Sequence, residues 1–223
     1  MAGHSLGQLS ALAADVITLH DLFRIVDKRA ELMMRVQESG KLATIIGLDK
    51  SIMEEICKEV SKILGTVSIA LENSDKQYVI GGKEKDADSA VSKIESEGAL
   101  KIVELKVSNA FHTYLMEPMV QPFSDFINTI VFNEPNAKVL LNARGGAESV
   151  GEIKKDIIEQ CVNAVKWKDC MHILLESKDA FIAEMGIGKT MSSLMRGMPH
   201  KCKIYSISNN VDFDMFLSAT NKS

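Results

Sequence analysis

Apolar residues along the chain follow two spacings: the three-to-four-residue spacing of a helix face and the alternation of a half-buried strand. The first two segments, Leu6–Ala14 and Asp21–Val36, have the helical spacing. The segments after them predict strand, helix, strand, strand, helix and strand in turn: Lys41–Leu48, Ser51–Leu64, Thr66–Leu71, Gln77–Gly81, Glu84–Glu97 and Lys101–Val107. This β-α-β-β-α-β order predicts a ferredoxin-like subdomain.

A second alternation of helices and strands follows. The pattern predicts helices at Glu117–Val131, Val150–Val162, Lys168–Glu176 and Thr190–Arg196, and strands at Lys138–Asn142, Ala180–Met185 and Lys203–Ser208. Such alternation is typical of an α/β layer with a largely parallel sheet. The sequence therefore predicts an α/β fold with a large subdomain, residues 1–40 and 109–223, and an inserted ferredoxin-like small subdomain, residues 41–108.

Composition narrows the class of protein. Hydrophobic residues make up 46% of the 223 positions, and no apolar run approaches the roughly 18 to 20 residues that a membrane span requires. The formal net charge is −4 and the basic residues form no stripe, so we expect no nucleic-acid partner. The four cysteines lack zinc-site spacing, and no secretory signal precedes them. We expect a soluble, cytoplasmic protein with reduced thiols and no metal.

The pentapeptide Gly3-His4-Ser5-Leu6-Gly7 fits the pattern G-x-S-x-G of a nucleophilic serine. The glycines allow a crowded strand-to-helix turn, which exposes the serine oxygen and directs the following backbone N–H groups at an oxyanion. The alternative is a helix N-cap built from glycine and serine. Both interpretations place Ser5 immediately before a helix.

A serine nucleophile needs a base, and the chain has five histidines. His112 is the best candidate, because it follows Asn109-Ala110-Phe111 just after a predicted strand, where a loop can direct its ring at the serine. His20, His172 and His200 lie among polar or charged neighbours. We predict that these three are surface side chains.

Several segments across nearly the whole chain resemble, in the correct order, the motifs of the malonyl-CoA:acyl carrier protein transacylase family. They are Gly3–Ala11 (G-H-S-L-G-E-x-S-A in the family), Val26–Arg29 (its arginine-bearing helix), Asn73–Gly82 (N-S-P-x-Q-x-V-I-x-G), Asn109–Met116 (A-F-H-S-x-L-M), Val165–Trp167 (V-Q/R-W) and Glu184–Lys189 (E-x-G-P-G-K). The resemblance implies an acyltransferase with an α/β-hydrolase-like large subdomain.

The resemblance also implies a reaction. Ser5 would attack the thioester of malonyl-CoA with His112 as base, and the thiol of an acyl carrier protein would then take the malonyl group, in a ping-pong cycle without a further cofactor. The backbone N–H of Leu6 would stabilise the oxyanion. The resemblance places this cycle in fatty acid or polyketide biosynthesis.

Four further residues match substrate-binding positions of the family. Arg29 corresponds to the arginine that pairs with the malonyl carboxylate, a task that suits a planar guanidinium. Phe111 accompanies malonyl rather than methylmalonyl selection in the family. Asn73 and Gln77 match the edge of the pocket, although both are also ordinary turn residues. From the local sequence alone, Arg29 would be read as a solvated helix residue.

The sequence departs from the family pattern at Gln8, where glutamate is usual, at Asp75, where proline is usual, and at Lys166, where glutamine or arginine helps to hold the histidine loop. The family's second oxyanion donor lies in a Gly-Gln-Gly segment that precedes the serine turn. Only Met1 and Ala2 precede Gly3. We therefore expect a truncated N-terminal part and weak activity, unless a partner chain supplies the missing segment. The alternatives are an acyl-carrier-protein hydrolase and a non-catalytic fragment.

Overall fold

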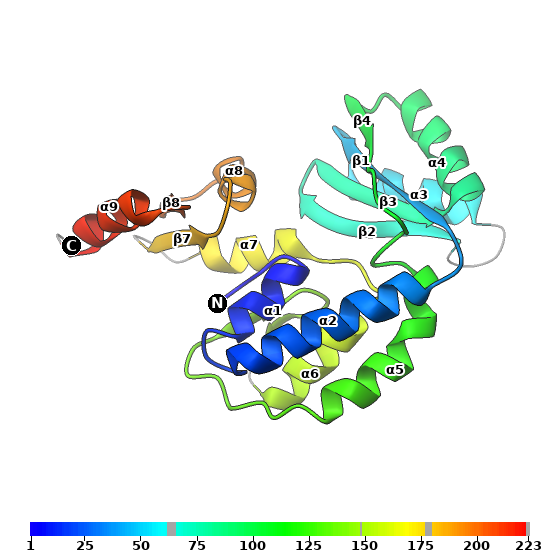
Figure 1. The fold of residues 1–223 in the computed structure, drawn as a ribbon. Helices are drawn as coiled ribbons and strands as arrows, with labels where there is room; N and C mark the ends of the chain where they lie inside the picture. Colours follow the sequence, from blue (N-terminus) through cyan, green and yellow to red (C-terminus); the bar gives the residue numbers. More distant parts are fainter. Residues whose placement is uncertain (62–65, 148, 177–179, 222–223) are drawn as a thin grey trace. The chain divides into compact units, whose positions relative to one another are not determined.

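The computed structural model describes residues 1–61, 66–147, 149–176 and 180–221 (Figure 1). The chain forms two compact units, Met1–Cys170 and Met171–Ser223. Antiparallel and parallel strand pairs occur together, which confirms the predicted mixed α/β class. The predicted subdomain boundaries at residues 41 and 108 stay a prediction.

A four-stranded sheet lies within the first unit. Its strands are β1 (Gly40–Ile46), β2 (Val67–Ser74), β3 (Gln77–Lys83) and β4 (Lys101–Glu104), in the order β2-β3-β1-β4 with every neighbouring pair antiparallel. Helix α3 (Lys50–Val60) connects β1 to β2, and α4 (Glu84–Ser96) connects β3 to β4 (Figure 1). This is the predicted ferredoxin-like arrangement. The predicted end of the first helix, residues 62–64, lies outside the described residues.

Both helices pack on one face of this sheet. Met53 of α3 and Ile94 of α4 are fully buried against Ile45 and Ile80 of the sheet, in an apolar cluster of their own. Fully burying one such side chain contributes roughly 1.5–3 kcal/mol, so this cluster gives the sheet a core separate from the one described next.

The rest of the first unit is mainly helical. Its elements are α1 (Leu6–Leu12), α2 (Leu19–Arg35), the short 3-10 helix η1 (Tyr114–Met116), α5 (Glu117–Asn128), β5 (Val139–Leu141), β6 (Gly145–Ala147), α6 (Val150–Glu159) and α7 (Trp167–Leu175), which continues into the second unit. Leu9, Ile25, Phe123 and Ile157 meet in its apolar core. The antiparallel pair of β5 with β6 was not predicted.

Residues 1–3 run beside β5. The Leu140 N–H donates to the Met1 carbonyl at 2.8 Å, and the Met1 amino group donates to the Lys138 carbonyl at 2.5 Å. Met1 thus bonds to Lys138 and Leu140, the residues on either side of Val139, which is the hydrogen-bond pattern of two parallel strands. These two bonds therefore fix the backbone of Met1, four positions ahead of Ser5, beside β5.

The second unit contains the parallel pair β7 (Phe181–Met185) and β8 (Lys203–Ile207), with α8 (Thr190–Arg196) between them. These three elements match their predicted positions closely. Helix α9 (Asn210–Thr220) was not predicted. It begins at Asn209, whose side chain accepts the Asp212 N–H at 3.0 Å, and its apolar residues do not gather on one face. Helical periodicity therefore gives no signal there.

Candidate functional site

Ser5 lies in a strained turn at the N-terminus of α1. Its φ of 49° is unusual for a residue with a side chain. Ser5 occupies the N-cap position but its hydroxyl makes no capping bond, which decides against the plain N-cap interpretation. The turn is tight: a Cβ at Gly3 would lie 2.0 Å from the Gly7 carbonyl oxygen, whereas a Cβ at Gly7 would meet nothing. Only the first glycine of the motif is therefore required for space.

His112 is the partner of the Ser5 hydroxyl. Its Nε2 lies 2.8 Å from Ser5 Oγ, and its φ of 63° is also in the left-handed region. Two hydrogen bonds fix the loop that carries His112. Asn109 Oδ1 accepts the Ala110 N–H, and Thr113 Oγ1 donates to the Ala110 carbonyl. Side chains 107 positions apart in the sequence are thus brought into hydrogen-bond contact.

The second ring nitrogen of His112 sets the tautomer. Nδ1 lies 2.6 Å from the backbone carbonyl of Gln160, at the C-terminal end of α6, where helix carbonyls lack intrahelical donors. A carbonyl only accepts, so Nδ1 carries the proton and Nε2 presents its lone pair to Ser5. Burial lowers the pKa of His112 to about 3; the Gln160 carbonyl opposes this shift, and the charge of Arg29 adds to it. The ring is therefore neutral near pH 7.

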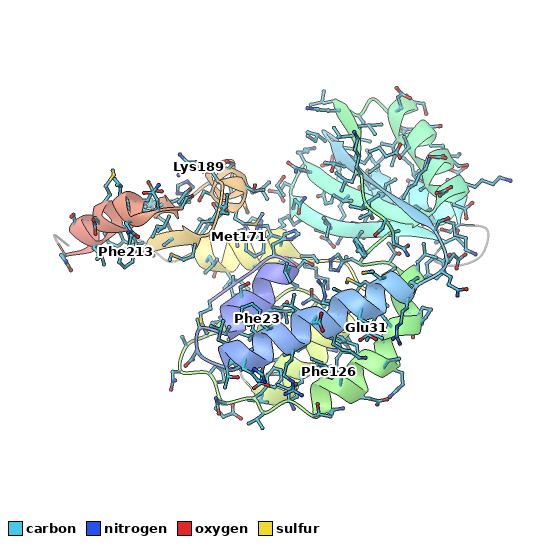
Figure 2. The ribbon with its side chains drawn as sticks, in the orientation of Figure 1. Phe23, Glu31, Phe126, Met171, Lys189 and Phe213 are labelled. Atoms are coloured by element: carbon cyan, nitrogen blue, oxygen red, sulfur yellow. The ribbon has the colours of Figure 1, made fainter. Side chains whose placement is uncertain are left out.

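Arg29 lies on the buried stripe of α2, between Ile25 and Leu32. Its Nη2 donates to Ser5 Oγ at 3.2 Å, and only 9% of the residue is exposed. The solvated-residue interpretation of Arg29 is therefore wrong. Among the described residues no carboxylate forms an ion pair with it, whereas Glu31, labelled in Figure 2, pairs with Lys28 and Arg35 on the same helix.

A buried polar network, which the sequence did not reveal, surrounds the serine turn. Asn142 bridges the turn, because its Nδ2 donates to the Gly3 carbonyl at 2.8 Å and its Oδ1 accepts the Ser5 N–H at 2.6 Å. Asp156 accepts the Asn142 N–H at 3.1 Å and Gln8 Nε2 at 2.9 Å. These polar residues are fully buried, and periodicity treats such positions as apolar core.

The remaining candidates lie around these residues. The Leu6 N–H, at the first residue of α1, has no acceptor within the described part of the chain, and the Leu6 side chain is half exposed. Asn73 Oδ1 lies 3.0 Å from His4 Nε2, and Phe111 packs against the first apolar core. No hydrogen bond among the described residues joins Gln77 to the serine.

Lys166, which stands where the family has glutamine or arginine, donates its backbone N–H to the Asn142 carbonyl at 2.7 Å. The His112 ring itself is held by the Gln160 carbonyl. His20 and His172 are exposed, as predicted, and His200 is half-buried. The described residues hold no group of three or more His, Cys, Asp or Glu arranged for a metal ion. Among them, no helix combines the length and apolarity needed to cross a membrane.

Comparison with known proteins identifies the family. Residues 1–192 match the family model described as "Acyl transferase domain". The chain belongs to the acyl transferase family. It is 33% identical over 209 residues to the malonyl CoA-acyl carrier protein transacylase of Staphylococcus aureus, a match that covers 92% of this acyl transferase chain and 68% of the relative.

Solved structures agree with the sequence relatives. FabD from Acinetobacter baumannii matches with a TM-score of 0.92 and 30% identity, covering 100% of this acyl transferase chain and 72% of FabD. A malonyl-transacylase solved in complex with a type II polyketide synthase acyl-carrier protein matches with a TM-score of 0.93 and 28% identity, covering 98% and 72%. The motif resemblance to malonyl-CoA:acyl carrier protein transacylases is thereby confirmed.

Proposed function

We propose that the chain transfers a malonyl group from malonyl-CoA to the phosphopantetheine thiol of an acyl carrier protein, through a malonyl ester on Ser5. One arrangement carries this proposal: the Ser5 hydroxyl contacts both a neutral histidine at 2.8 Å and a buried arginine at 3.2 Å. The histidine serves the chemistry and the arginine serves the substrate.

In the first half-reaction, His112 Nε2 takes the Ser5 proton while Oγ attacks the thioester carbonyl. The tetrahedral intermediate collapses when the carbon–sulfur bond breaks, and His112 returns the proton to the departing coenzyme A thiolate. General acid–base help of this kind contributes about 10²- to 10⁴-fold. We assign the oxyanion to the Leu6 N–H, which has no acceptor among the described residues, and one such donor contributes about 2.7–4 kcal/mol.

Arg29 is the basis for choosing malonyl. A buried guanidinium that pairs with no carboxylate among the described residues favours a substrate with a free carboxylate, which accepts two parallel hydrogen bonds from it. A charge-assisted bond of this kind contributes roughly 1.5–3 kcal/mol. A hydrolase of neutral acyl chains has no use for this cation. Phe111, next to the base, is proposed to crowd the site against a branched substrate, and Asn73 and Gln77 to line its edge.

In the second half-reaction, a carrier-protein thiol attacks the malonyl-serine ester, and His112 moves the proton from the thiol to Ser5 Oγ. The similar malonyl-transacylase solved with an acyl-carrier protein supports this choice of partner. Each step uses a side chain or backbone group of this chain, so the proposal includes no cofactor beyond the coenzyme A of the substrate.

Mass spectrometry of the Ser5 peptide after mixing the chain with malonyl-CoA or acetyl-CoA tests the proposal. We expect malonyl on Ser5, no label in Ser5→Ala, and loss of the label when holo acyl carrier protein is added. Arg29→Ala should lower the malonylation rate roughly 10- to 100-fold, the loss of one charge-assisted contact, and spare acetylation.

Arg24→Ala is the matched control, since Arg24 lies on the same helix but is exposed and paired with Asp21. It should leave both rates unchanged. Equal labelling by the two thioesters would contradict the assigned substrate. Spontaneous loss of the label to water, faster than transfer to the carrier protein, would favour the hydrolase.

A further inference from the structure

We propose that Asp156 is a positioning residue that holds Ser5 and His112 in register through two separate chains of hydrogen bonds. The inference rests on the proposed function of these two residues. Asp156 is fully buried in α6 and touches neither of them directly. Its carboxylate instead accepts bonds from Gln8, from the Asn142 N–H and from the Ala143 N–H at 2.9, 3.1 and 2.9 Å.

The first chain of bonds leads to the serine. By accepting the N–H groups of Asn142 and Ala143, Asp156 fixes the turn that follows β5. The Asn142 side chain then forms hydrogen bonds with the backbone of the serine turn, at the Gly3 carbonyl and at the Ser5 N–H. A strained residue keeps its conformation only when its surroundings over-determine it, and these bonds supply that constraint.

The second chain leads to the histidine. Gln8 Nε2 donates to Asp156, and Gln8 Oε1 accepts from Gln160 Nε2 at 2.6 Å. The Gln160 backbone N–H also donates to the Asp156 carbonyl at 2.8 Å, which is the ordinary α-helical bond and does not depend on the Asp156 side chain. The Gln160 carbonyl in turn fixes the His112 ring. Asp156 therefore sets the position of the acceptor that determines the His112 tautomer.

The donor pattern explains why this position needs a carboxylate. Burial raises the pKa of Asp156, and the bonds from Gln8, Ala143 and Asn142 oppose that rise. In Asp156→Asn one acceptor becomes an amide donor that faces Gln8 Nε2. If the Gln8 amide turns over to accept from it, the Gln8 amide nitrogen then faces Gln160 Nε2. In both arrangements the new amide nitrogen also opposes the Asn142 N–H, and the opposite orientation of the amide sets it against the Ala143 N–H. Every arrangement therefore sets two donors against each other and breaks at least one chain of bonds.

The reciprocal exchange provides the test. In the double variant Gln8→Glu/Asp156→Asn, the carboxylate introduced at position 8 accepts from both the amide introduced at position 156 and Gln160. The path to His112 is thus restored, while the Asn142 N–H loses its acceptor. We expect Asp156→Asn to lower kcat for malonylation of Ser5 roughly 10²-fold with little change in KM, the size of effect that a small displacement of reacting groups produces. The double variant should recover at least tenfold of this loss.

Ile94→Ala is the matched control for destabilisation, because Ile94 is fully buried in the separate core of the ferredoxin-like sheet. The melting temperature of each variant is measured beside its rate. The proposal is overturned if Asp156→Asn keeps the wild-type rate, if the double variant is no faster than Asp156→Asn, or if Ile94→Ala loses as much rate at an equal loss of melting temperature.

A readout independent of activity separates this inference from the proposed function. The Nδ1-bound proton of His112 should give a protected resonance in nitrogen-edited NMR spectra of the wild type and the double variant, and should exchange rapidly in Asp156→Asn. Absence of malonyl-Ser5 from the wild type would refute the proposed function alone. An equally protected proton in Asp156→Asn would refute the positioning role alone.

Discussion

The buried His112 ring should make the stability of the chain depend on pH in a defined window. The pKa of His112 falls from its ordinary value of 6.5 to about 3 on folding, mainly because burial disfavours the charged ring. Between these two values the unfolded chain binds a proton at this residue and the folded chain does not. Stability therefore falls as the pH falls from 6.5 toward 3, and His112 contributes no pH dependence above that range.

The size of the effect follows from the same values. One pKa unit corresponds to about 1.4 kcal/mol, so acidification from pH 7.5 to 4.5 should cost roughly 2–3 kcal/mol at this residue alone. Burial also lowers the pKa of His4, which adds to the wild-type slope in the same direction. Replacing His112 with glutamine keeps an N–H donor for the Gln160 carbonyl and removes the titrating ring, while His4 remains.

Urea unfolding of the wild type and His112→Gln between pH 4.5 and 7.5 measures this contribution. Trp167, the single tryptophan of the chain, is 3% exposed and gives a fluorescence signal for the first unit. The difference between the two free energies of unfolding should change by roughly 2–3 kcal/mol between pH 7.5 and 4.5. His20→Gln, at an exposed position, controls for the loss of one histidine. Parallel curves for the wild type and His112→Gln would refute the linkage.

Two further predictions concern the serine turn and the coupling of Arg29 to His112. Gly3→Ala should destabilise the chain by at least about 1–3 kcal/mol, because the new Cβ would clash with the Gly7 carbonyl. Gly7→Ala should stabilise it by about 0.5–1 kcal/mol, because a Cβ there meets nothing. Equal melting temperatures of the two variants would contradict this difference. The Arg29 charge lowers the pKa of His112, so malonate bound to Arg29 should raise that pKa by neutralising the charge. An NMR titration of His112 that shows no shift while malonate is bound would refute this coupling.

Periodicity and motif order predicted most of the fold, because most elements bury one regular face. Helix α8 begins and ends at the predicted residues, Thr190 and Arg196, and the four strands of the ferredoxin-like sheet pair in the predicted topology. The errors occur where the pattern is weak. Helix α9 has apolar residues on all sides, and β6 is only three residues long. The strand predicted to continue to Val107 ends at Glu104.

The candidate site likewise contains residues that the sequence predicted and residues that it did not. Ser5, Arg29 and His112 could be named from the sequence because each lies in a short motif, and the structure brings the three side chains together. Asn142 and Gln160 could not be named. Asn142 contributes through a side-chain bridge to the backbone of the serine turn, and Gln160 contributes through its main-chain carbonyl. No sequence pattern indicates that a main-chain carbonyl is used in this way.

Burial gives a physical reason for these unpredicted partners. A neutral histidine in an apolar core has one donor nitrogen and one acceptor nitrogen, and leaving either unpaired costs about 1–3 kcal/mol. Ser5 satisfies the acceptor of His112, and the donor needs a group that only accepts. The end of α6 supplies one, since the Gln160 carbonyl lies beyond the last turn and has no helical donor. The burial that lowers the pKa of His112 therefore also requires the contact that makes it a base.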